Sequence, residues 1–178
     1  AINIELRRAG LLSIREEMGR EYLDAGASEA FAVTDHQIAH VYVRNRNNIE
    51  NIASVLRNMS GIEHVSIGSG RDSLEHDRSG DIVAVTEHDK WFTHDWWMSD
   101  ATAPDYQATV DIHRKPGYDP RELFLASGWR GSRIRIALKL LLKKLGKRTL
   151  LDVIALDPKV VRGSHGRTPS MGAPAPIL

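Results

Sequence analysis

A mixed α/β fold, in one domain over residues 1–178, is predicted by three features of the sequence. Segments rich in β-branched residues occur at 30–43, 62–68 and 79–86, and turn residues accompany them. Apolar residues recur with the period of a helix at 47–59 and 132–146. The composition, 42% hydrophobic and 26% charged, is typical of a globular protein. A chain of 178 residues is short enough to fold around a single hydrophobic core.

The charge and cysteine content restrict the function. A net charge of +1 gives no overall field that would attract a nucleic-acid polymer. The absence of cysteine excludes disulfides, thiolate zinc sites and cysteine nucleophiles, and it fits a reducing compartment, so we expect a cytoplasmic protein. No apolar run of about 18 residues predicts a membrane span, and no signal peptide is visible. Because the sequence begins with Ala1, we expect the start of the gene product to be missing.

The first quarter of the sequence predicts a short helix and a hairpin. Residues 2–10 have the pattern of a helix that a glycine ends. Residues 11–23 suit either a strand or a helix, because an alternating start runs into helix-favouring residues. Two β-rich runs, 30–33 and 38–43, flank the polar residues 34–37, which predicts two strands joined by a turn.

The middle of the sequence predicts further packing elements. An amphipathic helix is expected over 47–59, a strand over 62–68, and another strand in 79–86 after a turn at Ser79 and Gly80. The aromatic-rich segment 90–100 is expected to be half-buried. A short helix is expected to start at Asp119, with proline in its first turn.

A basic helix is predicted over 132–146. Eight basic residues and no acidic residue lie between Arg130 and Arg148, which is typical of a membrane-surface or phosphate-binding helix. The alternative is a core helix with a solvated basic face. We expect the core helix, because a stripe of apolar residues shares one face: Ile134, Leu138, Leu141 and Leu145.

The sequence "GSHG" makes His165 a candidate metal ligand. A neutral imidazole binds zinc well, and flanking glycines let the backbone approach an ion closely. The alternative is a histidine in a surface turn.

Two other Asp and His pairs are candidates. Asp35 and His36 could bind one ion only where the chain kinks, because neighbours on a strand point to opposite faces; a simple hairpin turn is the alternative. Asp111 and His113 would share one face of a strand, as ligands or as an orienting pair, or would be merely structural. The segment 87–97 could line a substrate pocket or form an edge strand.

Several stretches of this sequence resemble the C-terminal part of the alkaline phosphatase superfamily. They are "AFAVTDHQIAHVYV", "LEHDRSGDIVAV", "WFTHDWW", "VDIHRKPGYDPRELF" and "VRGSHGR". The branch that they resemble is the type I phosphodiesterase/nucleotide pyrophosphatase family, and the last two stretches are the more specific. The resemblance implies the C-terminal part of an alkaline-phosphatase-like α/β sandwich.

The resemblance also implies a two-metal hydrolase of phosphodiester or pyrophosphate bonds. The ions would be zinc, with manganese as an alternative, and the substrate a phosphorylated small molecule. His165 matches the final metal ligand of the family, in an "HG" loop, and His113 before "GYD" is its rival. Asp35, His36 and Asp111 would border the site, and Arg162 or Arg167 would contact a substrate phosphate.

The departures from the family pattern limit this prediction. The family's N-terminal Asp, its Thr or Ser nucleophile and its middle Asp and His ligands have no assigned counterparts, and we assign no catalytic residue to this chain. We therefore expect an incomplete enzyme, inactive alone, which an N-terminal half or a partner chain completes. Two alternatives stay open: a phosphonate or phosphomonoester hydrolase of the same superfamily, and a non-catalytic subunit that binds a phosphorylated ligand.

Overall fold

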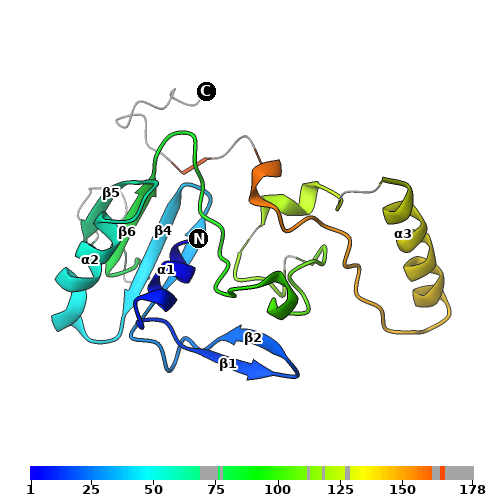
Figure 1. The fold of residues 1–178 in the computed structure, drawn as a ribbon, viewed down its shortest axis with the longest axis horizontal. Coiled ribbons are helices and arrows are strands. Elements are labelled where there is room, and N and C mark those ends of the chain that lie inside the picture. Colours follow the sequence, from blue (N-terminus) through cyan, green and yellow to red (C-terminus); the bar gives the residue numbers. More distant parts are fainter. Residues whose placement is uncertain are drawn as a thin grey trace.

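The computed structural model describes residues 1–68, 76, 78–111, 113–117, 119–126, 129–161 and 165–166. Its main body is a four-stranded antiparallel sheet in the order β3-β4-β6-β5, with helices α1 and α2 packed on it (Figure 1). The strands are β3 Ala30–Asp35, β4 Ile38–Val43, β5 Ile62–Ile67 and β6 Ile82–Thr86. The predicted mixed α/β class and these four strands are confirmed.

The helices α1 (Ile2–Arg8) and α2 (Ile49–Arg57) form where the sequence predicts helices. The side chain of Asn3 on α1 pairs with the main chain of Ala32: its Nδ2 donates to the carbonyl oxygen at 2.9 Å, and its Oδ1 accepts from the amide at 2.8 Å. This pair satisfies backbone groups of edge strand β3 and fixes α1 beside it.

The ambiguous segment 11–23 forms a small separate sheet. Its strands β1 (Ile14–Glu17) and β2 (Arg20–Leu23) pair as an antiparallel hairpin. Met18 and Gly19 between them both have positive φ, 52° and 73°, which is the backbone that a tight two-residue hairpin turn requires.

The core lies between the helices and the sheet. Central strand β6 is buried at every position. Ile2, Leu6, Ile52 and Leu56 bring the apolar faces of the two helices into the same cluster. Trp96 and Trp97 are each only 3% exposed, so the aromatic segment is more deeply buried at these positions than we expected.

The basic helix exists, but the prediction that it packs in the core is wrong. The helix α3 spans Trp129–Lys144 and stands apart from the sheet, at the far end of the molecule (Figure 1). The four residues of its apolar stripe are 53–70% exposed. The periodicity of the sequence was sufficient for a helix, but it carries no information on whether another element covers the apolar face.

This difference predicts unequal effects of two leucine truncations. Leu56→Ala in α2 should lower the free energy of unfolding by about 2–5 kcal/mol, because Leu56 is fully buried and its removal leaves a cavity. Leu141→Ala in α3 should change it by less than about 0.5 kcal/mol, because Leu141 is 53% exposed. Urea unfolding of both variants measures the difference. Equal losses would show that α3 is packed after all.

Candidate metal centre

The turn between β3 and β4 kinks at His36. This residue has a φ of +53°, in the left-handed region that residues other than glycine seldom adopt. Asp35 ends β3, and Asp35 and Ile38 are the last paired residues of the hairpin. His36 is 7% exposed. This kink meets the condition set out from the sequence, because only a kinked backbone lets the neighbouring Asp35 and His36 side chains face one ion.

The segment at His165 lies against this turn. The carbonyl oxygen of His165 accepts a hydrogen bond from the backbone N–H of Gln37 at 2.9 Å. The imidazole rings of His165 and His36 stack, with centroids 3.9 Å apart and an interplanar angle of 23°. The fold therefore brings together two histidines that are 129 residues apart in the sequence.

Gly166 allows this approach. Its φ is +112°, and a Cβ added to it would lie 3.3 Å from the amide nitrogen of Ile38 and 3.4 Å from the carbonyl oxygen of Asp35. Both the backbone conformation and the contact with the turn disfavour any larger residue. The close backbone approach at this glycine is to the β3–β4 turn.

Asp35, His36 and His165 form the one group of three or more possible metal ligands found in the described ranges. One ligand atom from each residue lies within 4.8 Å of the others. His36 is buried, whereas Asp35 and His165 are exposed, so one side of the group is open to solvent. One carboxylate and two imidazoles are ligands typical of zinc and other divalent transition metals.

The environment of His36 favours its neutral form. Burial lowers the pKa of His36 below its ordinary value, and the nearby His165 ring lowers it further. The carboxylates of Asp35 and Asp119 act in the opposite direction but do not reverse the shift. A neutral imidazole keeps the lone pair that metal ligation requires.

Gln37 fixes the turn from behind. Its side-chain Nε2 donates to the carbonyl oxygens of Lys90 at 3.0 Å, His88 at 3.1 Å and Glu87 at 3.3 Å. Its carbonyl oxygen accepts from the Thr86 amide at 3.0 Å. Its backbone N–H is bound to His165. Gln37, which is 5% exposed, therefore connects the β3–β4 turn to β6, to the loop at 87–90 and to residues 165–166.

A buried charge cluster lies beside the turn. Arg121, which is fully buried, donates from Nη2 to Asp95 at 2.7 Å and from Nε to Asp119 at 2.9 Å. Buried Lys115 pairs with Glu122 at 2.8 Å. Burial acts to raise the pKa of Asp119, but the hydrogen bonds and charge of Arg121 outweigh it and hold that pKa below its ordinary value. The Asp119 carboxyl therefore stays ionised at neutral pH.

The other predicted site residues do not join the group. Asp111 and His113 do not share a strand face, because residues 110–117 form no strand where the structure describes them. Asp111 pairs instead with Arg114, Oδ2 to Nε at 3.4 Å, and His113 is exposed. The expectation of a strand pair is wrong, because the glycine and proline of this stretch favour turns. Arg162 and Arg167 lie outside the described residues.

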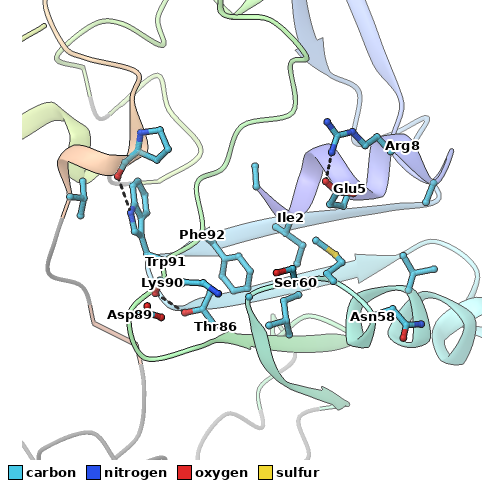
Figure 2. A pocket seen from close by; sticks show the side chains of 18 of the residues that line it. Ile2, Glu5, Arg8, Asn58, Ser60, Thr86, Asp89, Lys90, Trp91 and Phe92 are labelled. Atoms are coloured by element: carbon cyan, nitrogen blue, oxygen red, sulfur yellow. Dashed lines mark hydrogen bonds and ion pairs between the residues drawn. The ribbon is translucent and has the colours of Figure 1, made fainter. Parts of the chain in front are cut away.

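A cavity of about 850 Å³ opens next to this centre (Figure 2). Ile2, Ser60 and Phe92 face into it, and Trp91 stands at one end. The cavity and the turn share a wall: the Phe92 amide donates to the His36 carbonyl oxygen at 2.6 Å, and the Trp91 and His36 ring centroids are 6.5 Å apart. Of the two alternatives for segment 87–97, an edge strand is not formed, and Trp91 and Phe92 line the cavity.

Sequence reasoning missed Gln37 and the cluster around Arg121. The predicted helix start at Asp119 is correct, since its side chain caps the 3₁₀ helix Pro120–Leu123 by accepting from the Arg121 amide. Nothing in one sequence shows that Arg121 and Lys115 are buried, because both residue types are usually exposed.

The buried His94 predicts a pH effect on stability. Its Nε2 lies 2.9 Å from Gln107 Oε1, and burial holds its pKa below the ordinary value of 6.5. The unfolded chain therefore binds a proton at a pH where the folded chain does not. Its contribution is fully present above pH 6.5 and is lost as the pH falls towards the folded pKa, by up to about 1.4 kcal/mol per pH unit. Urea unfolding at pH 7.5, 6.5 and 5.5, with EDTA present, measures the slope.

The control is His94→Gln, which cannot titrate. Its loss of stability over the same pH interval should be smaller than that of the wild type. An identical slope in the two proteins would contradict the role of His94.

Comparisons with known proteins support one family. The family model described as type I phosphodiesterase / nucleotide pyrophosphatase matches residues 2–119, well over half of the chain. Neither the curated proteins nor the solved structures provide a match. Within the described ranges, no helix combines the length and apolar character needed to cross a bilayer. The match includes the β3–β4 turn with Asp35 and His36 and ends at Asp119. The chain belongs to the type I phosphodiesterase/nucleotide pyrophosphatase family.

Proposed function

We propose that this chain forms part of the metal site of a hydrolase that cleaves phosphodiester or pyrophosphate bonds. The observation that carries the proposal is the group of Asp35, His36 and His165, whose ligand atoms lie within 4.8 Å of one another. Zinc is the ion that this set of ligands favours, with manganese as the alternative. When bound, the ion would polarise a phosphoryl oxygen of the substrate.

The residues of the chain have separate tasks in this proposal. Asp35, His36 and His165 hold the ion, and burial keeps His36 neutral and ready to ligate. Gln37 is a positioning residue, because it holds both the turn and the main chain of His165. The cavity beside Trp91 offers space for the organic part of a phosphate ester, and an indole ring can stack on a planar group there.

These residues account for one ion of the two that the family resemblance implies. We assign no nucleophile in the described part of the chain, and we propose that the nucleophile and the ligands of a second ion come from outside it. Arg162 and Arg167 remain candidates for phosphate contacts. A non-catalytic subunit that binds a phosphorylated ligand is the second candidate, because the same group could bind an ion and a phosphate without turnover.

The test combines metal binding with turnover of the purified chain. Isothermal titration should give about one zinc ion per chain, and the zinc-loaded chain should bind inorganic phosphate. A chromogenic nucleotide diester should show no turnover above a His165→Ala control, because activation of a nucleophile is as necessary as the ion.

The outcomes separate the possibilities. Turnover well above the His165→Ala control would show that the chain already holds a nucleophile. Turnover of a phosphomonoester in place of the diester would support the phosphatase alternative. Failure to bind zinc or manganese in the micromolar range would overturn the proposed metal site.

A further inference from the structure

The exposed apolar stripe of α3 has no covering element in the described residues. Ile134, Leu138, Leu141 and Leu145 are 70%, 55%, 53% and 67% exposed. Their spacing of four, three and four residues places them on one side of the helix, along about 17 Å of its length. Water contact with so many aliphatic side chains is unfavourable, so the stripe is suited to a surface outside this chain.

Residues 150 and 152 contact α3 on a different side from the stripe. Lys139 donates from Nζ to the carbonyl oxygen of Leu150 at 2.7 Å and also pairs with Asp152. Arg135 Nη2 lies 3.4 Å from Asp152 Oδ2. By helical geometry Arg135 and Lys139 lie roughly 110° around the helix from the stripe. The attachment therefore leaves the stripe facing away from residues 149–152.

The helix itself carries only positive charges. The sequence from Arg130 to Arg148 holds eight basic and no acidic residues. Lys143 and Lys144 at the end of α3 are exposed, and so are Lys147 and Arg148, which follow after Leu145 and Gly146. Long basic side chains beside an apolar stripe can keep their charges at a lipid headgroup layer while the aliphatic residues enter the hydrocarbon boundary.

We propose that α3 lies in the plane of an anionic membrane surface, with its apolar stripe inserted and its basic residues at the lipid phosphates. A second copy of the chain is a poor occupant, because two such helices would bring like charges together. The stripe contains no aromatic residue, although aromatic side chains dominate the binding energy of protein interfaces. Each cation near an anionic leaflet adds to the binding.

The experiment uses the full chain and vesicles of phosphatidylcholine with 30% phosphatidylglycerol, compared with pure phosphatidylcholine. The wild type should sediment with the anionic vesicles. Leu138→Asp should lower the partition coefficient at least about tenfold, and so should the double variant Lys143→Glu/Lys144→Glu. The matched charge control is Arg44→Glu/Arg57→Glu, two exposed cations outside α3, which should bind nearly as the wild type does.

The lack of cysteine allows a direct measure of insertion. An environment-sensitive dye on Leu138→Cys should shift its emission to shorter wavelength when anionic vesicles are added. The same dye on Met18→Cys should not shift, because Met18 is fully exposed on the β1–β2 turn. Circular dichroism confirms that each variant keeps its fold.

Four results would overturn the proposal. The first is no sedimentation of the wild type with anionic vesicles. The second is equal vesicle binding by the wild type and Leu138→Asp. The third is an emission shift of the dye on Met18→Cys as large as that of the dye on Leu138→Cys. The fourth is a wild type that is dimeric in solution while Leu138→Asp is monomeric, because a second copy would then cover the stripe.

Discussion

His165→Ala is expected to weaken zinc binding by more than about 100-fold. The substitution removes one of the three proposed ligands, and the two that would remain offer too few donors to hold the ion tightly. A change at a residue that only orients a ligand costs less, typically about 10–100-fold. Gln37→Leu should fall in this second range, because it leaves all three ligands but removes the side-chain bonds to the loop at 87–90.

The measurement is isothermal titration of zinc into wild type, His165→Ala, Gln37→Leu and His113→Ala. His113→Ala is the matched control, because His113 is an exposed histidine outside the group and was the rival candidate from the sequence. Loss of zinc binding in His113→Ala with full binding in His165→Ala would show that the wrong histidine had been chosen. The "GSHG" sequence would then be only a turn.

Arg121→Leu is expected to destabilise the fold by about 3–5 kcal/mol. The substitution removes the nearer of the two cations that pair with Asp119, which is 1% exposed, and leaves only Lys115, whose Nζ lies 3.9 Å from Asp119 Oδ2. It also removes the bonds to Asp95 and to the Leu156 carbonyl oxygen. A typical domain has only about 5–15 kcal/mol of stability in total. The variant should therefore unfold at a much lower urea concentration than the wild type.

The control for this prediction is Arg135→Leu. That substitution breaks the pair with Asp152 at 3.4 Å, but the Arg135 side chain is 59% exposed. Exposed ion pairs contribute about 0–1 kcal/mol, so the control should unfold close to the wild type. Similar losses in both variants would mean that burial does not distinguish the two pairs.

The sequence predicted most elements of the main body, because their signals are local. The strands on either side of the β3–β4 turn and the helices α1 and α2 follow from alternation, 3.6-residue periodicity and glycine stops. The β1–β2 hairpin was ambiguous, since the positive φ of Met18 decides it and methionine rarely adopts that conformation. The position of α3 was not predictable, because burial depends on elements distant in sequence.

The candidate site was predictable in its parts but not in its assembly. The sequence marked Asp35, His36 and His165 separately, and it left the first two only bordering the site. Their meeting depends on the left-handed backbone at His36 and on the hydrogen bond from Gln37 to His165. A single sequence contains no signal for a contact over such a separation. The short turn "TDHQ" is also compatible with an ordinary hairpin.

The contact between the β3–β4 turn and residues 165–166 has a consequence for how metal retention can be used as a probe. A bound ion would link two points of the chain that are 130 residues apart, with strands β4, β5 and β6 and helix α2 between them. Such a link cannot survive when the intervening sheet unravels, since the entropy of closing so long a loop must then be met by the ligands alone. Release of zinc during a urea titration should therefore coincide with loss of the core, so the ion would report on the integrity of the whole domain and not only on its own surroundings.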